Sequence, residues 1–107
     1  MKVLFLPEVE EYLYELAEIL YQKEYFGFKE SATEYVRDLV VEIMTSLPNK
    51  HKKIAPDYFS KYGKDMFYAN FKRSKNTQWY VFFTIYEKKQ VYLVRYMGTN
   101  HTCSQYL

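Results

Sequence analysis

The fold is decided by residues 79–97, which read WYVFFTIYEKKQVYLVRYM. This stretch holds two runs rich in aromatic and β-branched residues, 79–86 and 91–97, separated by the polar segment 87–90. Such a pattern predicts two neighbouring antiparallel strands joined by a short turn. Because successive side chains of a strand point to opposite faces, the first run presents two sets. One set, suited to meeting helices, is Trp79, Val81, Phe83 and Ile85; the other, expected on an open face, is Tyr80, Phe82, Thr84 and Tyr86.

A third β-rich run, residues 66–72, precedes these two and completes a predicted antiparallel meander. Residues 49–63 carry several lysines, two prolines or glycines and no clear periodicity, which predicts a basic, irregular connection. At the other end of the chain, residues 1–6 read as a short strand.

Two helices are predicted between the first strand and the basic connection. Apolar residues recur at helical spacing from Pro7 to about Tyr25. A second helix is expected from Ser31, where Glu34 three residues later completes a capping box, until Pro48 halts it. Because the link between the two helices is short, they should pack as an antiparallel hairpin.

The length of 107 residues suits one domain. We therefore expect a single α+β domain over residues 1–107, in which the N-terminal strand and the helix hairpin pack on a twisted antiparallel β-sheet. Aromatic residues make up 21% of the chain, and thirteen of them are tyrosines. Tyrosine has an apolar ring and a polar tip, so this composition favours a half-exposed sheet or a contact surface.

Charge is divided along the chain. Residues 1–49 carry four basic and ten acidic residues, whereas residues 50–107 carry eleven basic and three acidic ones. This asymmetry favours a polyanionic partner for the C-terminal half. The alternative is a charge-segregated surface that is simply solvated.

The chemistry of Cys103 and the two histidines excludes several classes of function. Cys103 is the only cysteine, so an internal disulfide is impossible and a reducing, cytoplasmic location is expected. The sequence predicts neither a signal peptide nor a membrane span. His51, His101 and Cys103 show no familiar zinc spacing, and no glycine-rich phosphate loop is present, so we expect no metal and no cofactor.

The end of the chain resembles a known family. Residues 91–101, VYLVRYMGTNH, are followed shortly by Tyr106. This resembles the last strand of HigB-type toxins, which ends in an aromatic, an aliphatic, Gly-Thr-His and then a tyrosine, although here Asn100 separates Thr99 from His101. The order of strands and helices over nearly the whole chain is similar to that of the RelE/ParE superfamily of toxins from type II toxin–antitoxin pairs.

The resemblance implies a cytoplasmic toxin that is held inactive by a cognate antitoxin. When free, it would enter the ribosome and cut messenger RNA without a metal, by attack of a ribose 2′-OH on the adjacent phosphate. Carried over by position, His101 is the acid–base candidate, Arg95 is a phosphate-binding or structural cation, and Tyr106 is a proton-transfer or base-stacking residue.

This sequence departs from the family where RNA binding is concerned. Relatives carry basic residues about where Tyr68, Asn70 and Tyr80 stand. Binding would then depend on aromatic stacking and on cations at the ends of the strands. The candidate RNA-binding residues are Lys64, Lys72, Arg73, Lys75, Tyr68, Tyr80 and Phe82.

Each catalytic candidate also has a structural interpretation. His101 is compatible with an ordinary exposed position in the tail, and Tyr106 with a frayed terminus. Arg95 shares its parity with Val91 and Leu93, so it could equally face the helices and pair with one of their glutamates.

Two other functions fit the same fold. ParE-like members of the superfamily inhibit DNA gyrase without an RNA-cutting site, and a catalytically inert relative would only bind its antitoxin. His101 near Arg95 with a basic rim would favour the nuclease. A neutral cleft with His101 pointing away would favour the binding proteins.

Overall fold

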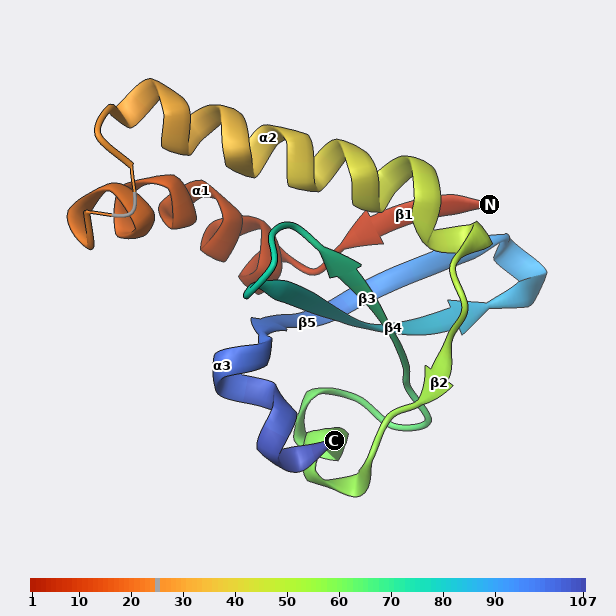
Figure 1. The fold of residues 1–107 in the computed structure, drawn as a ribbon. Helices are drawn as coiled ribbons and strands as arrows, with labels where there is room; N and C mark the ends of the chain where they lie inside the picture. The colour runs from red at the N-terminus through yellow and green to blue at the C-terminus, as the bar shows by residue number, and fades with distance from the viewer. Residues whose placement is uncertain (25) are drawn as a thin grey trace.

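The computed structural model describes residues 1–24 and 26–107 (Figure 1). The strands are β1 (Lys2–Phe5), β2 (Lys53–Ile54), β3 (Phe67–Lys72), β4 (Gln78–Tyr86) and β5 (Val91–Thr99). The α-helices are α1 (Pro7–Gln22), α2 (Lys29–Ser46) and α3 (Asn100–Cys103). Short 3-10 segments are η1 (Leu47–Asn49), η2 (Asp57–Tyr62), η3 (Glu87–Lys89) and η4 (Ser104–Tyr106). The predicted α+β class is confirmed, and the predicted helix end at Tyr25 lies outside the described residues.

The strands form one sheet in the order β1-β5-β4-β3-β2. Strands β2 to β5 are antiparallel neighbours, as the meander predicted, but β1 runs parallel to β5. The sheet is therefore mixed rather than wholly antiparallel. No hairpin sets the direction of β1, because most of the chain separates it from β5.

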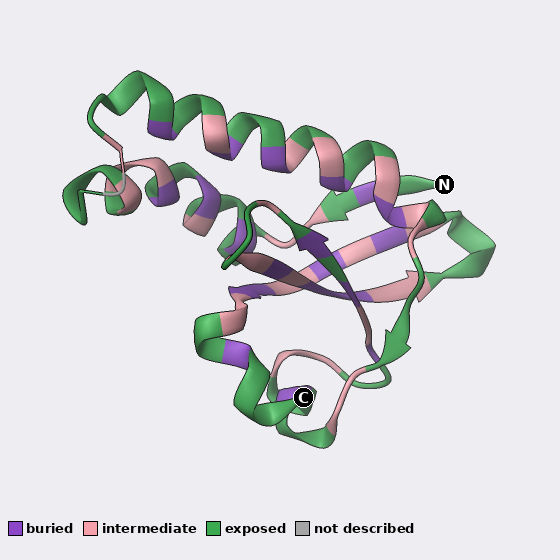
Figure 2. Ribbon diagram, viewed as in Figure 1, coloured by how far each residue is buried: buried purple, intermediate pink, exposed green. Residues whose placement is uncertain are grey.

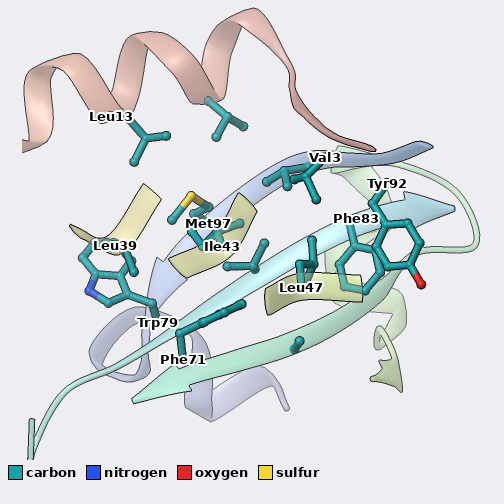
Figure 3. Packing of buried hydrophobic residues seen from close by; sticks show 14 of the residues in the cluster. Val3, Leu13, Leu39, Ile43, Leu47, Phe71, Trp79, Phe83, Tyr92 and Met97 are labelled. Atoms are coloured by element: carbon teal, nitrogen blue, oxygen red, sulfur yellow. The ribbon is translucent and has the colours of Figure 1, made fainter. Parts of the chain in front are cut away.

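The helix hairpin covers one face of the sheet and forms the main core with it (Figures 1 and 2). The predicted inward set of β4 is confirmed: Trp79, Val81 and Phe83 are buried there, and Ile85 packs at the margin. Figure 3 shows side chains of α2, such as Leu39, meeting those of the sheet. The Trp79 indole donates a hydrogen bond to the hydroxyl of Tyr35 at 3.0 Å, which satisfies its N–H in this apolar setting.

The start of α2 differs from the prediction. The helix begins at Lys29, with Phe28 in extended conformation before it and no side chain capping its first turn. The capping box of Ser31 and Glu34 is therefore not formed. Lys29 makes an ion pair of 3.0 Å with Glu18 of α1, which ties the new first residue to the neighbouring helix.

The second face of the sheet is not open, contrary to the prediction. Residues 55–66 and the C-terminal segments lie across it, with the chain end beside the loop before β3 (Figure 1). Phe82 is fully buried there at 0% exposure, against Phe59, Met66 and Cys103. Phe59 stacks on Phe82 with ring centroids 4.3 Å apart. Tyr62, Tyr68, Tyr80 and Tyr96 pack around this second cluster.

A β-bulge at Arg95 changes the parity of β5. Phe82 pairs with Tyr96 whereas Phe83 pairs with Val94, so Arg95 is an extra residue on its strand. Val94 belongs to the helix-side core, whereas Tyr96 packs in the second cluster. The expectation that Arg95 faces the helices and pairs with a glutamate is therefore wrong: its contacts are with Thr84 and Tyr86 of the second face.

Candidate functional site

A cleft of about 600 Å³ lies where the end of β5, the start of α1 and η2 meet. Part of its wall is apolar and comes from Leu6, Val9 and Met97. Its polar and aromatic lining consists of Glu8, Tyr12, Lys61, Tyr62, Arg95, Tyr96, Thr99 and Thr102. The cleft therefore combines two cations and one carboxylate with three phenols.

The bulge in β5 positions Arg95 in this cleft. Its Nε donates to the Thr84 hydroxyl and one terminal nitrogen donates to the Tyr86 hydroxyl, both at 2.8 Å. Gly63, which follows η2, lies against the side chain: a Cβ there would come within 2.5 Å of Arg95 Cδ. Because glycine has no side chain, η2 can approach Arg95 closely and bring Lys61 to the same cleft.

Lys61 lies beside two stacked pairs of tyrosines. Tyr58 stacks on Tyr106 with ring centroids 3.5 Å apart, and Tyr62 stacks on Tyr96 at 3.9 Å. The Lys61 ammonium is 4.2 Å from the ring centroid of Tyr58 and 5.4 Å from that of Tyr62. Cation–π attraction of this kind is worth about 0.5–1 kcal/mol at an exposed position. Lys61 thus joins the Tyr58–Tyr106 pair to the lining of the cleft.

The paired phenols Tyr58 and Tyr106 differ in acidity. Hydrogen bonds from the Tyr106 hydroxyl and from the Lys61 ammonium lower the pKa of Tyr58 below its usual value. The same contact raises the pKa of Tyr106, which keeps its proton longer. The hydrogen bond to Tyr58 also raises the pKa of Lys61, so its ammonium stays charged.

Burial has the opposite effect on two deeper groups. It raises the pKa of Tyr96 and, secondarily, the nearby Cys103 thiol acts in the same direction. Burial likewise raises the pKa of Cys103, which lies beneath Gly98 at 1% exposure. Both groups therefore stay neutral at working pH and serve as structural neighbours of the exposed phenols.

The three predicted catalytic residues are not all brought together. Arg95 lines the cleft, and Tyr106 joins it through Tyr58 and Lys61. His101 is exposed on α3 and is not among the described residues that line the cleft. On the criterion of a neutral cleft with a distant histidine, the position of His101 counts against a histidine-based nuclease.

The predicted RNA-binding residues are also dispersed. Lys64, Lys72 and Lys75 are exposed, but none of the three is part of the cleft lining. Tyr68 and Tyr80 are half-buried, with ring centroids 6.0 Å apart in an edge-to-face contact. The second cluster buries Phe82 completely, so its ring cannot stack on a base in this conformation.

Arg73 lies on the opposite, helix side of the sheet. Its guanidinium donates to the Glu42 carboxylate of α2 at 2.7 Å and lies 5.2 Å from the ring centroid of Tyr35. This partly buried ion pair ties the end of β3 to α2. The interpretation of Arg73 as an RNA-binding residue is therefore replaced by a structural one.

Sequence reasoning missed Lys61, Tyr58 and Tyr62. These residues lie in η2, within the stretch interpreted as an irregular connection because Pro56 and Gly63 flank it. Their spacing of three and four residues was a usable signal, since side chains at those intervals share one side of a helical segment. The contacts with Tyr96 and Tyr106 come from tertiary structure alone.

A second concave surface lies between β1 and the helix hairpin. It has a volume of about 680 Å³ and is almost wholly apolar, with Glu10 and Arg37 as its charged residues. Val41 and Met44 of α2 are about half exposed beside it, and Tyr14 of α1 is 85% exposed. Its chemistry suits contact with another apolar surface rather than catalysis.

The described residues contain no group of three or more His, Cys, Asp or Glu side chains that could hold a metal ion. In the part of the chain that the structure describes, no helix has the length and apolar character needed to cross a membrane. Comparison with models of known protein families, with curated proteins and with solved structures finds no significant match to this chain.

Proposed function

We propose that this chain is the toxin of a RelE/ParE-like toxin–antitoxin pair and that it cleaves messenger RNA on the ribosome. The observation that carries the proposal is the convergence of Lys61 and Arg95 with two stacked tyrosine pairs at one cleft. Cations suit a phosphate whose charge grows in the transition state, and phenols suit proton transfer and base stacking.

In the proposed reaction, a ribose 2′-oxygen loses its proton and attacks the neighbouring phosphorus. The bond from phosphorus to the 5′-oxygen then breaks, which leaves a 2′,3′-cyclic phosphate and a free 5′-hydroxyl. The site must accept one proton, stabilise the phosphorane and return one proton to the 5′-oxygen. Lys61 and Arg95 are assigned to the phosphate, and the phenols are assigned to the protons.

Arg95 is suited to the phosphate because its guanidinium is fixed but not used up. A guanidinium has five N–H donors, and hydrogen bonds to Thr84 and Tyr86 hold two of them. These bonds fix the orientation of the planar group, which reduces the conformational freedom lost when it grips a phosphate. His101 has no part in bond breaking on this proposal, because it lies outside the cleft lining.

The test is to map messenger RNA ends in a cell-free translation reaction, with and without the purified protein. We expect cuts that require ribosomes and that fall about 100-fold or more in Arg95→Lys, which keeps the charge but loses the planar fork. Arg37→Lys, an exposed position on α2, is the matched control and should cut normally. Intact message with a folded wild-type protein would contradict the proposal.

A gyrase inhibitor or a catalytically inert antitoxin-binding protein is the second candidate. The observation that favours it is that Glu8 offsets part of the cationic charge in the cleft while His101 stands outside it. A supercoiling assay with purified DNA gyrase separates these cases. Inhibition together with intact message would support the ParE-like function.

The proposed antitoxin is expected to cover the apolar groove between β1 and the hairpin. Val41 and Met44 expose apolar surface there, which water disfavours and a partner of apolar surface would bury. The acidic excess of residues 1–49 predicts basic residues at the margins of that partner segment. Met44→Glu should weaken such binding without changing cleavage, as a pull-down against the cleavage assay would measure.

A further inference from the structure

The Tyr58–Tyr106 pair has a geometry that bulk packing does not require. Both rings are exposed at the surface of the second cluster, yet they lie almost parallel, with an interplanar angle of 4°. Phe59 contacts both edges-on, at 5.0 Å from Tyr58 and 6.3 Å from Tyr106. The buried ring of Phe59 therefore holds two exposed phenols in register, so that their hydroxyls meet.

The charged surroundings of Tyr58 are asymmetric. Its hydroxyl receives hydrogen bonds from Tyr106 of η4 and from Lys61 of its own segment. Cys103 of α3 is the remaining titratable group near it, and burial keeps that thiol neutral. Two donors, one of them a full positive charge, thus converge on one phenol oxygen and stabilise its ionised form.

We propose that Tyr58 is the proton acceptor of the site, with Tyr106 and Lys61 positioned to stabilise its phenolate. The assignment rests on the proposed RNA cleavage and names a residue for the step that starts it. The ribose 2′-O–H bond breaks, its proton moves to the Tyr58 oxygen, and the 2′-oxygen forms the new bond to phosphorus. Lys61 lines the cleft beside Tyr58, so an attacking ribose held there has the phenol oxygen at its margin.

Two measurements on the same variants test this assignment. The first is ultraviolet titration of phenolate in the purified protein, which needs no RNA. The wild type should show one tyrosine that ionises below the usual range, and Tyr58→Phe should lose it. Tyr106→Phe and Lys61→Met should shift that ionisation upward, because each removes one donor. Tyr21→Phe, an exposed tyrosine of α1, is the matched control and should leave it unchanged.

The second measurement is the pH profile of ribosome-dependent cleavage. Tyr58→Phe should cut at least about 100-fold more slowly at every pH, which is the usual size of general-base catalysis. Tyr106→Phe and Lys61→Met should move the rising limb of the profile to higher pH while approaching a similar plateau. A purely structural role would lower the rate uniformly and leave the limb in place.

The outcomes separate this assignment from the proposed function. An early-ionising Tyr58 in a protein that cuts nothing would refute the nuclease, and with it the role of Tyr58 as a base. Ribosome-dependent cutting that survives in Tyr58→Phe, or a pH limb that neither Tyr106→Phe nor Lys61→Met moves, would overturn the assignment alone. Loss of cutting in Tyr58→Phe with the limb moved in the other two variants would establish it.

Discussion

On one face of the sheet, the helix hairpin buries a continuous set of sixteen residues, whereas on the other face short 3-10 segments bury only four. The helix-side core draws on α1, α2 and four strands, so its members support one another across the whole domain. The second cluster depends on residues 55–66 and the C-terminal segments, which have no helix longer than a few residues. Global stability therefore resides on the helix side, while the candidate chemistry rests on the face that is easier to open.

The sharpest test of this comparison truncates one phenylalanine on each face. Phe83→Ala in the helix-side core should lower the free energy of unfolding by about 3–5 kcal/mol. Phe59→Ala should cost only about 1–3 kcal/mol, because η2 can detach while the rest of the domain stays folded. Urea denaturation measures both values. Equal losses would mean that the two faces form one cooperative unit.

The elements with regular periodicity were the predictable ones, and the second face was not. Alternation in β4 correctly separated Trp79 from Phe82, because a strand's parity follows directly from its sequence. Nothing in the run around Arg95 distinguishes a bulge from a regular strand, so its face was predicted wrongly. The cover over Phe82 comes from η2 and the tail, whose burial depends on Phe59 alone rather than on a hydrophobic period.

A second test opens the tail without touching the helix-side core. A Cβ at Gly98 would lie 2.6 Å from the Cys103 sulfur, so Gly98→Ala should displace α3 from β5. Burial raises the pKa of Cys103 and hides its thiol, which makes the wild type slow to react with a thiol reagent. We expect labelling at least about tenfold faster in the variant at equal pH. Wild-type labelling kinetics would show that α3 absorbs the added methyl group in place.

A third test asks how much Arg95 contributes to folding. Its hydrogen bonds to Thr84 and Tyr86 are partly exposed, so Arg95→Ala should cost about 1–2 kcal/mol of unfolding free energy. Thermal and urea unfolding measure this loss, and Thr84→Val is the control that removes one of the two bonds. A collapse of the fold would instead place Arg95 among the residues that hold the second face together.

The smallest effect is expected at His101, where the resemblance and the geometry diverge. Its side chain is exposed on the short helix α3, and no hydrogen bond or ion pair of His101 is found among the described residues. His101→Ala should therefore change the free energy of unfolding by no more than about 0.5 kcal/mol. Because His101 lies outside the cleft lining, the variant should also keep the wild-type cutting pattern in the cell-free reaction. A large loss of cutting with unchanged stability would instead restore the histidine as the acid–base group, and would mean that α3 turns toward Arg95 when RNA is bound.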